Sequence, residues 1–179
     1  MKSFFINMLT VSRIILGAVI FIMLSRTDFY WTALVLFFIA GITDYFDGYF
    51  ARKHAAESVI GEILDPIADK ILIVFLLIAV SVSLSSFYIA FVSALIITRE
   101  IWVGALRDFN ARQEKSDATK VIFIAKIKTT IQLFTISIYL FGLAMNNMLV
   151  ILLADIMLFT SLLITFYTGF IYTINTFKK

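Results

Sequence analysis

The chain contains no cysteine, only one proline and one histidine, and few charged residues. Without cysteine it can form no disulfide, no thiolate nucleophile and no cysteine-ligated zinc or iron–sulfur site. Charged residues make up 15% of its 179 positions, whereas 61% are hydrophobic and 19 are phenylalanine. A soluble domain of this length would expose too much apolar surface, so the composition predicts an integral membrane protein.

A large basic surface is also missing. The formal net charge is +3, and no basic run is interleaved with aromatic residues. A protein that follows a nucleic-acid backbone usually has both features, so we expect no nucleic-acid partner. Membrane lipid is the expected anionic partner.

Six apolar segments approach the 20 residues that a helix needs to cross a bilayer. They are too long for strands, and the single proline leaves most of them unbroken. No signal peptide, soluble domain, linker or repeat is evident. We therefore expect an all-α fold of six transmembrane helices in a single domain covering residues 1–179. The predicted helices are 7–24, 31–52, 60–83, 87–107, 119–143 and 148–174.

The positive charges predict how these helices are oriented, because loops rich in Lys and Arg stay in the cytoplasm. Arg26 is the one positive charge expected on the opposite side. Both termini should therefore be cytoplasmic, in a protein of the cytoplasmic membrane. The charges that share the cytoplasmic side are Lys2, Arg52, Lys53, Arg107, Arg112, Lys115, Lys120, Lys178 and Lys179.

Four aspartates lie toward the cytoplasmic ends of the second and third predicted helices. Asp44 and Asp47 are three residues apart, and Asp65 and Asp69 are four apart. Residues at these spacings lie on one face of a helix, with Cβ atoms about 5–6 Å apart. Because the two helices are adjacent and antiparallel, we expect the four carboxylates to meet.

Carboxylates gathered in a poorly solvated cleft repel one another unless cations neutralise them. Hard divalent ions take oxygen ligands, and Mg²⁺ or Mn²⁺ suits a cluster without His or Cys. Four carboxylates can surround a pair of ions about 3.5–4 Å apart, so two ions are expected. The alternative is that the aspartates only form ion pairs with Arg52, Lys53 and Lys70.

The residues around the aspartates favour a ligand over simple ion pairing. Gly48 follows Asp47 and leaves space for a bulky group near the backbone. Arg52, one turn further on, suits a phosphate. Ser58 is open to two interpretations, because it could cap the third helix or contact a phosphate.

Together these residues form the pattern D-x2-D-G-x2-A-R-x8-G-x3-D-x3-D over residues 44–69, which resembles the signature of the CDP-alcohol phosphatidyltransferases. All eight positions match: Asp44, Asp47, Gly48, Ala51, Arg52, Gly61, Asp65 and Asp69. The resemblance implies an enzyme, usually a homodimer with two divalent ions, that displaces CMP from a CDP-linked lipid by the hydroxyl of a second alcohol.

The resemblance also implies a role for each residue. Asp44, Asp47 and Asp65 would hold the metal ions, and Asp69 would join them and act as the base that deprotonates the attacking hydroxyl. The residues implied in binding CDP-diacylglycerol are Asn7, Thr10, Gly48, Arg52, Ser58 and Gly61.

The acceptor alcohol has to be inferred from other segments. Arg99, Arg107, Lys126 and Lys128 lie near the same cytoplasmic level, and an acceptor with its own phosphate would need such a basic pocket. These stretches, with "NMLTVSR" at 7–13, resemble the phosphatidylglycerophosphate synthases of the family, whose acceptor is glycerol 3-phosphate. Simpler roles stay open, since the lysines could extend to lipid headgroups and Arg99 could neutralise Glu100.

Two other functions remain as alternatives. The first is the same chemistry with another acceptor, such as inositol phosphate or, in cardiolipin synthesis, phosphatidylglycerol. The second is a divalent-cation transporter. A transporter should carry polar groups on both sides of the membrane midplane, whereas here they gather on one side.

Overall fold

The computed structural model describes residues 2–26, 29–54, 59–114 and 123–178. Within the helices, no side chain is described for residues 2–7, 9, 45, 47–54, 59–63, 65–66 and 123–126. Several predicted site residues therefore have a described backbone but no described side chain: Asn7, Asp47, Gly48, Arg52, Gly61, Asp65 and Lys126. Ser58 lies outside the described residues altogether.

The described chain forms six α-helices and contains no strand, which confirms the predicted all-α class. The helices begin and end within a few residues of the predicted apolar segments. They are α1 (Lys2–Leu24), α2 (Tyr30–His54), α3 (Val59–Ser83), α4 (Phe87–Arg112), α5 (Phe123–Ala144) and α6 (Met148–Phe177).

Tight turns join α3 to α4 and α5 to α6, and a side chain caps the second helix of each pair. The hydroxyl of Ser86 accepts a hydrogen bond from the backbone N–H of Ile89 at the start of α4. The side-chain oxygen of Asn147 accepts one from the N–H of Leu149 at the start of α6, at 3.0 Å. Such caps satisfy backbone donors that have no partner within the helix. Asn146 takes the left-handed conformation (φ 48°) that commonly ends a helix.

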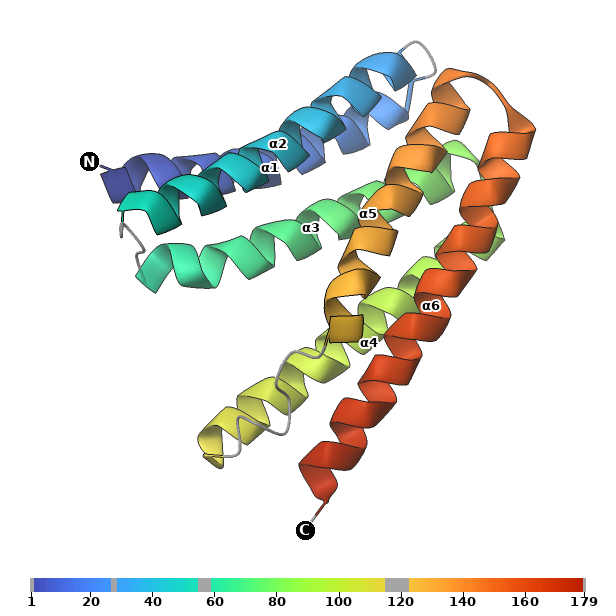
Figure 1. Ribbon diagram of the computed structural model, residues 1–179. Coiled ribbons are helices and arrows are strands. Elements are labelled where there is room, and N and C mark those ends of the chain that lie inside the picture. Colours follow the sequence, from blue (N-terminus) through green and yellow to red (C-terminus); the bar gives the residue numbers. More distant parts are fainter. Residues whose placement is uncertain (1, 27–28, 55–58, 115–122, 179) are drawn as a thin grey trace.

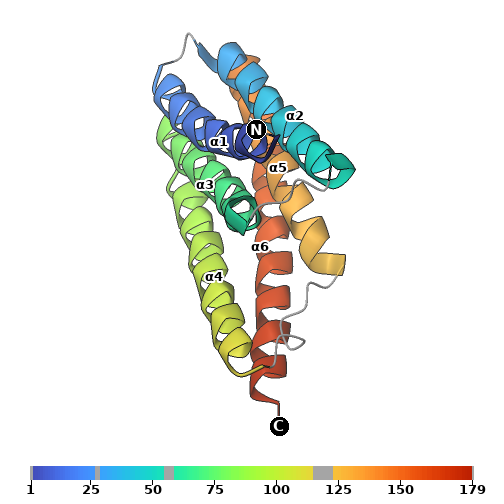
Figure 2. The same cartoon turned by 90° about the vertical axis from the view of Figure 1, so that its left-hand side faces the viewer.

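The helices form two groups, α1 to α3 and α4 with α6, that spread apart at one end (Figures 1 and 2). α1 packs on both α2 and α3, while α4 packs on α3 and α6. α5 joins the two groups, because it contacts α2, α3 and α6. The C-terminal ends of α1, α3 and α5 come together, whereas the other ends of the helices diverge (Figure 1).

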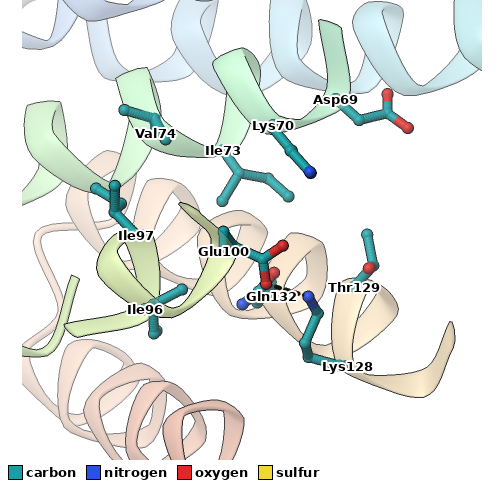
Figure 3. Close-up of a pocket in the computed structure, with 10 residues that line it drawn as sticks. All are labelled: Asp69, Lys70, Ile73, Val74, Ile96, Ile97, Glu100, Lys128, Thr129 and Gln132. Carbon is teal, nitrogen blue, oxygen red and sulfur yellow. Dashed lines mark hydrogen bonds and ion pairs between the residues drawn. The ribbon is translucent and has the colours of Figure 1, made fainter. Parts of the chain in front are cut away.

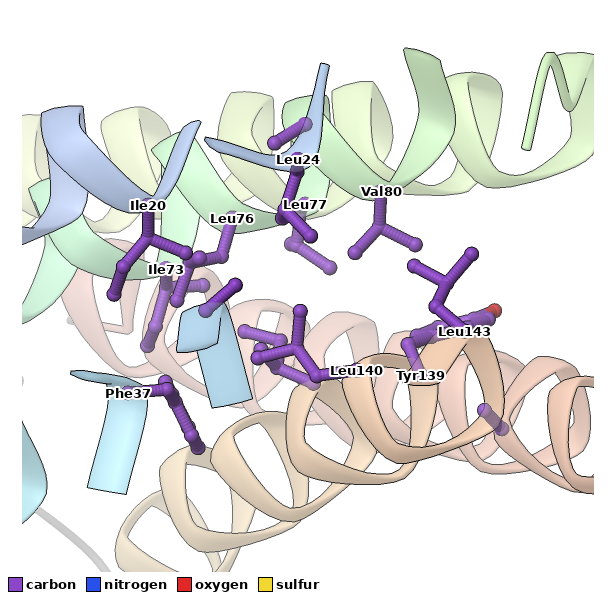
Figure 4. Packing of buried hydrophobic residues seen from close by; sticks show 14 of the residues in the cluster. Ile20, Leu24, Phe37, Ile73, Leu76, Leu77, Val80, Tyr139, Leu140 and Leu143 are labelled. Atoms are coloured by element: carbon purple, nitrogen blue, oxygen red, sulfur yellow. The ribbon is translucent and has the colours of Figure 1, made fainter. Parts of the chain in front are cut away.

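The hydrophobic core lies toward the end where the helices converge (Figure 4). Leu24, Val80 and Leu143 are buried within the last few residues of α1, α3 and α5. Other buried members of the cluster are Ile20, Phe37, Leu76, Leu77, Ile136 and Leu140. Because this packing fixes the convergent end, the diverging ends are left for polar groups.

The surface of α6 has the opposite polarity to that of a helix in a soluble protein. Large apolar side chains such as Leu152, Phe159 and Phe170 are exposed, while Ser161 and Thr165 are fully buried. Lipid-facing helices have this pattern, since apolar residues contact the hydrocarbon and small polar residues pack between helices. Three described helical segments are long and apolar enough to cross a membrane: Phe87–Arg112, Ile127–Ala144 and Met148–Phe177.

Candidate active site

Arg13 joins two of the predicted metal-binding aspartates. Its guanidinium is almost fully buried, and Nη1 lies 2.8 Å from Oδ1 of Asp44 and 2.5 Å from Oδ1 of Asp69. The three residues come from α1, α2 and α3; α1 packs on both other helices, whereas α2 and α3 make no direct contact within the described parts of the chain. The carboxylates stay partly exposed, at 50% for Asp44 and 43% for Asp69. Arg13 of α1 thus brings two of the four aspartates to one point, although the expected direct packing of the second helix on the third is not found among the described residues.

The donor set at this point suits a hard divalent cation. Two carboxylate oxygens from different helices already approach the same positively charged nitrogen, so the position attracts a cation. Asp47 and Asp65 lie one helical turn from Asp44 and Asp69, in backbone that is helical in α2 and α3. Among the described side chains, no group of three or more His, Cys, Asp or Glu residues could hold a metal ion. The side chains of Asp47 and Asp65 fall outside that set.

A polar pocket of about 210 Å³ lies between α3, α4 and α5 (Figure 3). Charged side chains from all three helices line it: Asp69 and Lys70, Glu100, and Lys128. In Figure 3 the ammonium groups of Lys70 and Lys128 and the carboxylate of Glu100 point into the same space. The other lining residues are Ile73, Val74, Ile96, Ile97, Thr129 and Gln132.

The charged groups in and beside this pocket form ion pairs and hydrogen bonds with one another. Oε1 of Glu100 accepts hydrogen bonds from Nη1 of Arg99, at 3.0 Å, and from Nζ of Lys128. Nη2 of Arg99 also donates to the hydroxyl of Thr168 on α6, at 2.5 Å. Arg99 is 6% exposed and is held from two helices. The predicted acceptor-binding residues Arg99 and Lys128 therefore do come together, with Glu100 between them.

Gly169 makes room for the guanidinium of Arg99. A Cβ atom at position 169 would lie 2.9 Å from Nε and 3.2 Å from Cγ of Arg99. Such distances are shorter than a carbon can tolerate, so any larger residue would displace the arginine. The glycine thus fixes the path of the Arg99 side chain along α6.

The other predicted site residues with described side chains lie apart from this pocket. Arg107 is two turns beyond Arg99, and its guanidinium carbon lies 5.8 Å from the centre of the Tyr172 ring. It does not line the pocket. Thr10 is fully buried in α1, one turn before Arg13.

A second, mostly apolar cavity of about 310 Å³ lies mainly between α2 and α5. Phe37, Phe38, Leu133 and Phe134 supply apolar walls, and Gly41 leaves one side without a side chain. Arg13, Asp44 and Asp69 also line it. Asp69 therefore borders both cavities, and charged side chains contribute to the lining of each.

Sequence reasoning did not place three charged residues in the substrate site that the structure brings here: Arg13, Lys70 and Glu100. Each lies within or at the edge of an apolar segment, where a charge is costly and usually has a partner or a function. The position of these charges within apolar segments was the feature of the sequence that could have identified them. The partner could not be read from the sequence, because Arg13 contacts residues 31 and 56 positions away.

Comparison with known proteins agrees with this geometry. A family model described as CDP-alcohol phosphatidyltransferase matches residues 5–167, which include the whole aspartate signature. The CDP-diacylglycerol–glycerol-3-phosphate 3-phosphatidyltransferase of Cereibacter sphaeroides is 38% identical over 146 residues, covering 79% of this chain and 65% of that protein.

Two further relatives carry the same enzyme name. The Blochmanniella floridana protein is 34% identical over 173 residues, which cover 94% of this chain and 89% of that protein. The Escherichia coli (strain K12) protein is 33% identical over 134 residues, or 73% of each chain. The match along most of the sequence, together with the aspartates that meet at Arg13, establishes that this chain belongs to the CDP-alcohol phosphatidyltransferase family.

Proposed function

We propose that this protein transfers a phosphatidyl group from CDP-diacylglycerol to glycerol 3-phosphate, giving phosphatidylglycerophosphate and CMP. The observation that carries the proposal is that Asp69 borders two cavities, one walled by phenylalanines and leucines and one lined by Lys70, Glu100 and Lys128. A lipid donor needs the first kind of surface, and a phosphorylated acceptor needs the second. The enzyme name shared by the relatives supports the same pair of substrates.

Asp69 is the proposed base. Its carboxylate takes the proton of the acceptor hydroxyl, and the hydroxyl oxygen then forms a bond to the phosphorus that carries diacylglycerol. The bond between that phosphorus and CMP breaks, so CMP leaves with the electron pair. Arg13 holds Asp69 against Asp44, which keeps the base facing the position where the two substrates meet.

The proposed metal ligands are Asp44, Asp47, Asp65 and Asp69, with two Mg²⁺ or Mn²⁺ ions. Oxygen ligands from carboxylates match the preference of these hard ions. When bound, the ions would neutralise the pyrophosphate and the negative charge that develops on CMP. The remaining signature residues would hold the CDP-lipid: Asn7, Thr10, Gly48, Arg52, Ser58 and Gly61.

The charged pocket is the proposed site for the acceptor phosphate. Lys128 is fixed at its wall by Glu100, Arg99 binds the same carboxylate from beside the pocket, and Lys70 adds a lining cation that sequence reasoning did not include in the acceptor site. A cationic pocket can form charge-assisted hydrogen bonds to a phosphate, whereas an uncharged alcohol would leave the cations unpaired. Lys126 remains a proposed contributor from the start of α5, whereas Arg107, over the ring of Tyr172, is left out of the proposed pocket.

The proposed setting is a homodimer in the cytoplasmic membrane, with six transmembrane helices and both termini in the cytoplasm. The aspartates and the charged pocket lie toward the ends of the helices that the positive charges assign to the cytoplasmic side. The active site therefore faces the cytoplasm, where a soluble phosphorylated acceptor has access to it.

The test is a comparison of acceptors with the purified protein. CMP release from CDP-diacylglycerol is measured with glycerol 3-phosphate, inositol phosphate, serine or phosphatidylglycerol. We expect fast release with glycerol 3-phosphate and background rates with the others. A preference for inositol phosphate or phosphatidylglycerol would mean that the proposed acceptor is wrong, whereas the proposed type of reaction would stand. Membership of a transferase family removes the support for a cation transporter.

A further inference from the structure

Glu100 is an acidic residue inside a pocket whose proposed ligand is an anion. Its carboxylate is 22% exposed and lines the pocket together with Lys70 and Lys128 (Figure 3). A carboxylate repels a phosphate, so simple phosphate binding gives no reason for an acid here. Its contacts point to a different role.

The Glu100–Lys128 ion pair links two helices that do not otherwise pack together. Within the described parts of the chain, α4 and α5 make no direct backbone-level contact, although both pack on α3 and α6. The ion pair therefore crosses the pocket from one wall to the other. Lys128 is buried to 8% exposure at its side chain, and Glu100 is the anion that holds its ammonium group there.

One oxygen of Glu100 serves both cations and leaves most of their donors available. An ammonium has three N–H donors and a guanidinium has five. Oε1 of Glu100 takes one from Lys128 and one from Nη1 of Arg99, while Thr168 takes one from Nη2. Nε of Arg99 is buried without a partner among the described residues. A phosphate can bind to the remaining donors while Glu100 stays in place.

The charge of the pocket also depends on Glu100. Two cations, Lys70 and Lys128, and two carboxylates, Asp69 and Glu100, line the pocket, and Arg99 adds a positive charge beside Glu100. Without Glu100 the three cations would be offset by Asp69 alone, and they would repel one another.

We propose that Glu100 is a positioning residue for the acceptor: it fixes Lys128 so that the remaining N–H donors of the ammonium group face the phosphate of glycerol 3-phosphate. The inference rests on the proposed function, because it presumes that the pocket binds this acceptor. It differs from a purely structural role, in which Glu100 would only stabilise the fold and would affect both substrates alike.

The experiment compares steady-state kinetics of the wild-type protein and Glu100→Gln, with each substrate varied in turn. We expect the KM for glycerol 3-phosphate to rise by roughly tenfold, since about one charge-assisted contact is lost. The KM for CDP-diacylglycerol should change by less than about twofold. Glu114→Gln, at an exposed position two residues beyond the end of α4, is the matched control and should behave as wild type.

A double mutant tests whether Glu100 acts through Lys128. Independent substitutions multiply their effects, whereas residues that act as a unit do not. We expect Glu100→Gln to add less than about threefold to the KM for glycerol 3-phosphate when Lys128→Met is already present. Fully multiplicative effects, a lower KM for the acceptor in Glu100→Gln, or equal effects on both substrates would each overturn the inference.

Two further results keep the test decisive. If Glu100→Gln does not fold, Glu100→Asp replaces it, because it keeps the charge but withdraws the carboxylate from Lys128; an unchanged acceptor KM in that variant contradicts the proposal. Inorganic phosphate, used as a competitive inhibitor, should bind more weakly to the variant, in parallel with glycerol 3-phosphate. A wild-type protein that ignores glycerol 3-phosphate would instead refute the proposed function itself.

Discussion

Asp69 connects the two halves of the candidate site. It borders both cavities, and its carboxylate binds the same nitrogen of Arg13 that binds Asp44. A base placed between two binding regions can serve a reaction in which a lipid donor and a polar acceptor approach from different sides. The position of this one residue therefore constrains the mechanism more than any other.

Asp69→Asn should abolish most turnover. The amide keeps the size of the side chain but cannot accept the proton of the acceptor hydroxyl, and positioned acid–base groups contribute about 10²–10⁴-fold to rate. CDP-diacylglycerol binding should persist in part, because three other carboxylates remain. The measurements are CMP release and binding of the CDP-lipid to the detergent-solubilised variant; near-normal turnover would remove Asp69 from the role of base.

Removal of divalent metal should also stop the reaction. The proposed ligands are four carboxylates with no soft donor, so activity lost on exhaustive chelation should return with Mg²⁺ or Mn²⁺. CMP release is measured before chelation, after it, and after each ion is added back. Full activity in the chelated protein would contradict the proposed metal site.

At the scale of elements, much was predictable from the sequence. Long apolar segments predicted all six helices to within a few residues, because each segment is longer than a strand and is bounded by polar or turn residues. The spacing of Asp44 from Asp47 and of Asp65 from Asp69 predicted that each pair lies on one helix face, whereas the bridge through Arg13 of α1 was not predicted. The local pattern of a sequence indicates where a helix lies and which of its residues share a face.

Contacts between distant helices were beyond the reach of the sequence. Nothing in the local pattern relates Arg99 to Thr168 or Lys128 to Glu100, which are 69 and 28 positions apart. Arg107 illustrates the same limit, because its position in α4 suggested the pocket, whereas its guanidinium lies over the ring of Tyr172. These contacts depend on how the helices cross, and periodicity within one helix does not determine the crossing.

The close approach of α6 to α4 gives a prediction for Gly169→Ala. The added methyl group would meet Arg99 near the end of its flexible side chain, so the arginine should shift at little cost in stability. We expect the KM for glycerol 3-phosphate to rise severalfold, while the thermal midpoint of unfolding stays nearly unchanged.

Gly104→Ala is the matched control for this variant. It lies in α4, and a Cβ atom there would meet nothing within 4 Å. Kinetics and thermal unfolding of the two variants should be measured side by side. If both alanine variants retain the wild-type acceptor KM, the position of Arg99 does not control acceptor binding.

At the scale of the whole molecule, the distribution of polarity supports the orientation in the membrane that we propose. Exposed apolar residues cover the outer faces of the helices, while the charged groups of the site lie toward the diverging ends. The positive charges of the loops and of the C-terminal segment favour the cytoplasm for the same ends. A soluble acceptor and a lipid donor can then reach Asp69 without either crossing the bilayer.

The absence of cysteine makes this orientation directly testable. Lys178→Cys and Phe87→Cys each introduce a single thiol, at opposite ends of the bundle and at exposed positions. In intact cells, a membrane-impermeant maleimide should label the thiol at position 87 but not the one at 178. In inside-out vesicles the pattern should reverse. Labelling of both from one side would contradict six membrane spans with cytoplasmic termini.

The central claim is that Asp69 lies where a CDP-linked lipid and glycerol 3-phosphate react. The most direct measurement follows labelled glycerol 3-phosphate into the lipid-extractable fraction while CMP is quantified in the same reaction. The account predicts one labelled lipid for each CMP released by the wild-type protein, with both products nearly absent in Asp69→Asn. Release of CMP without label in the lipid fraction would mean that the donor is hydrolysed and not transferred, and would contradict the claim.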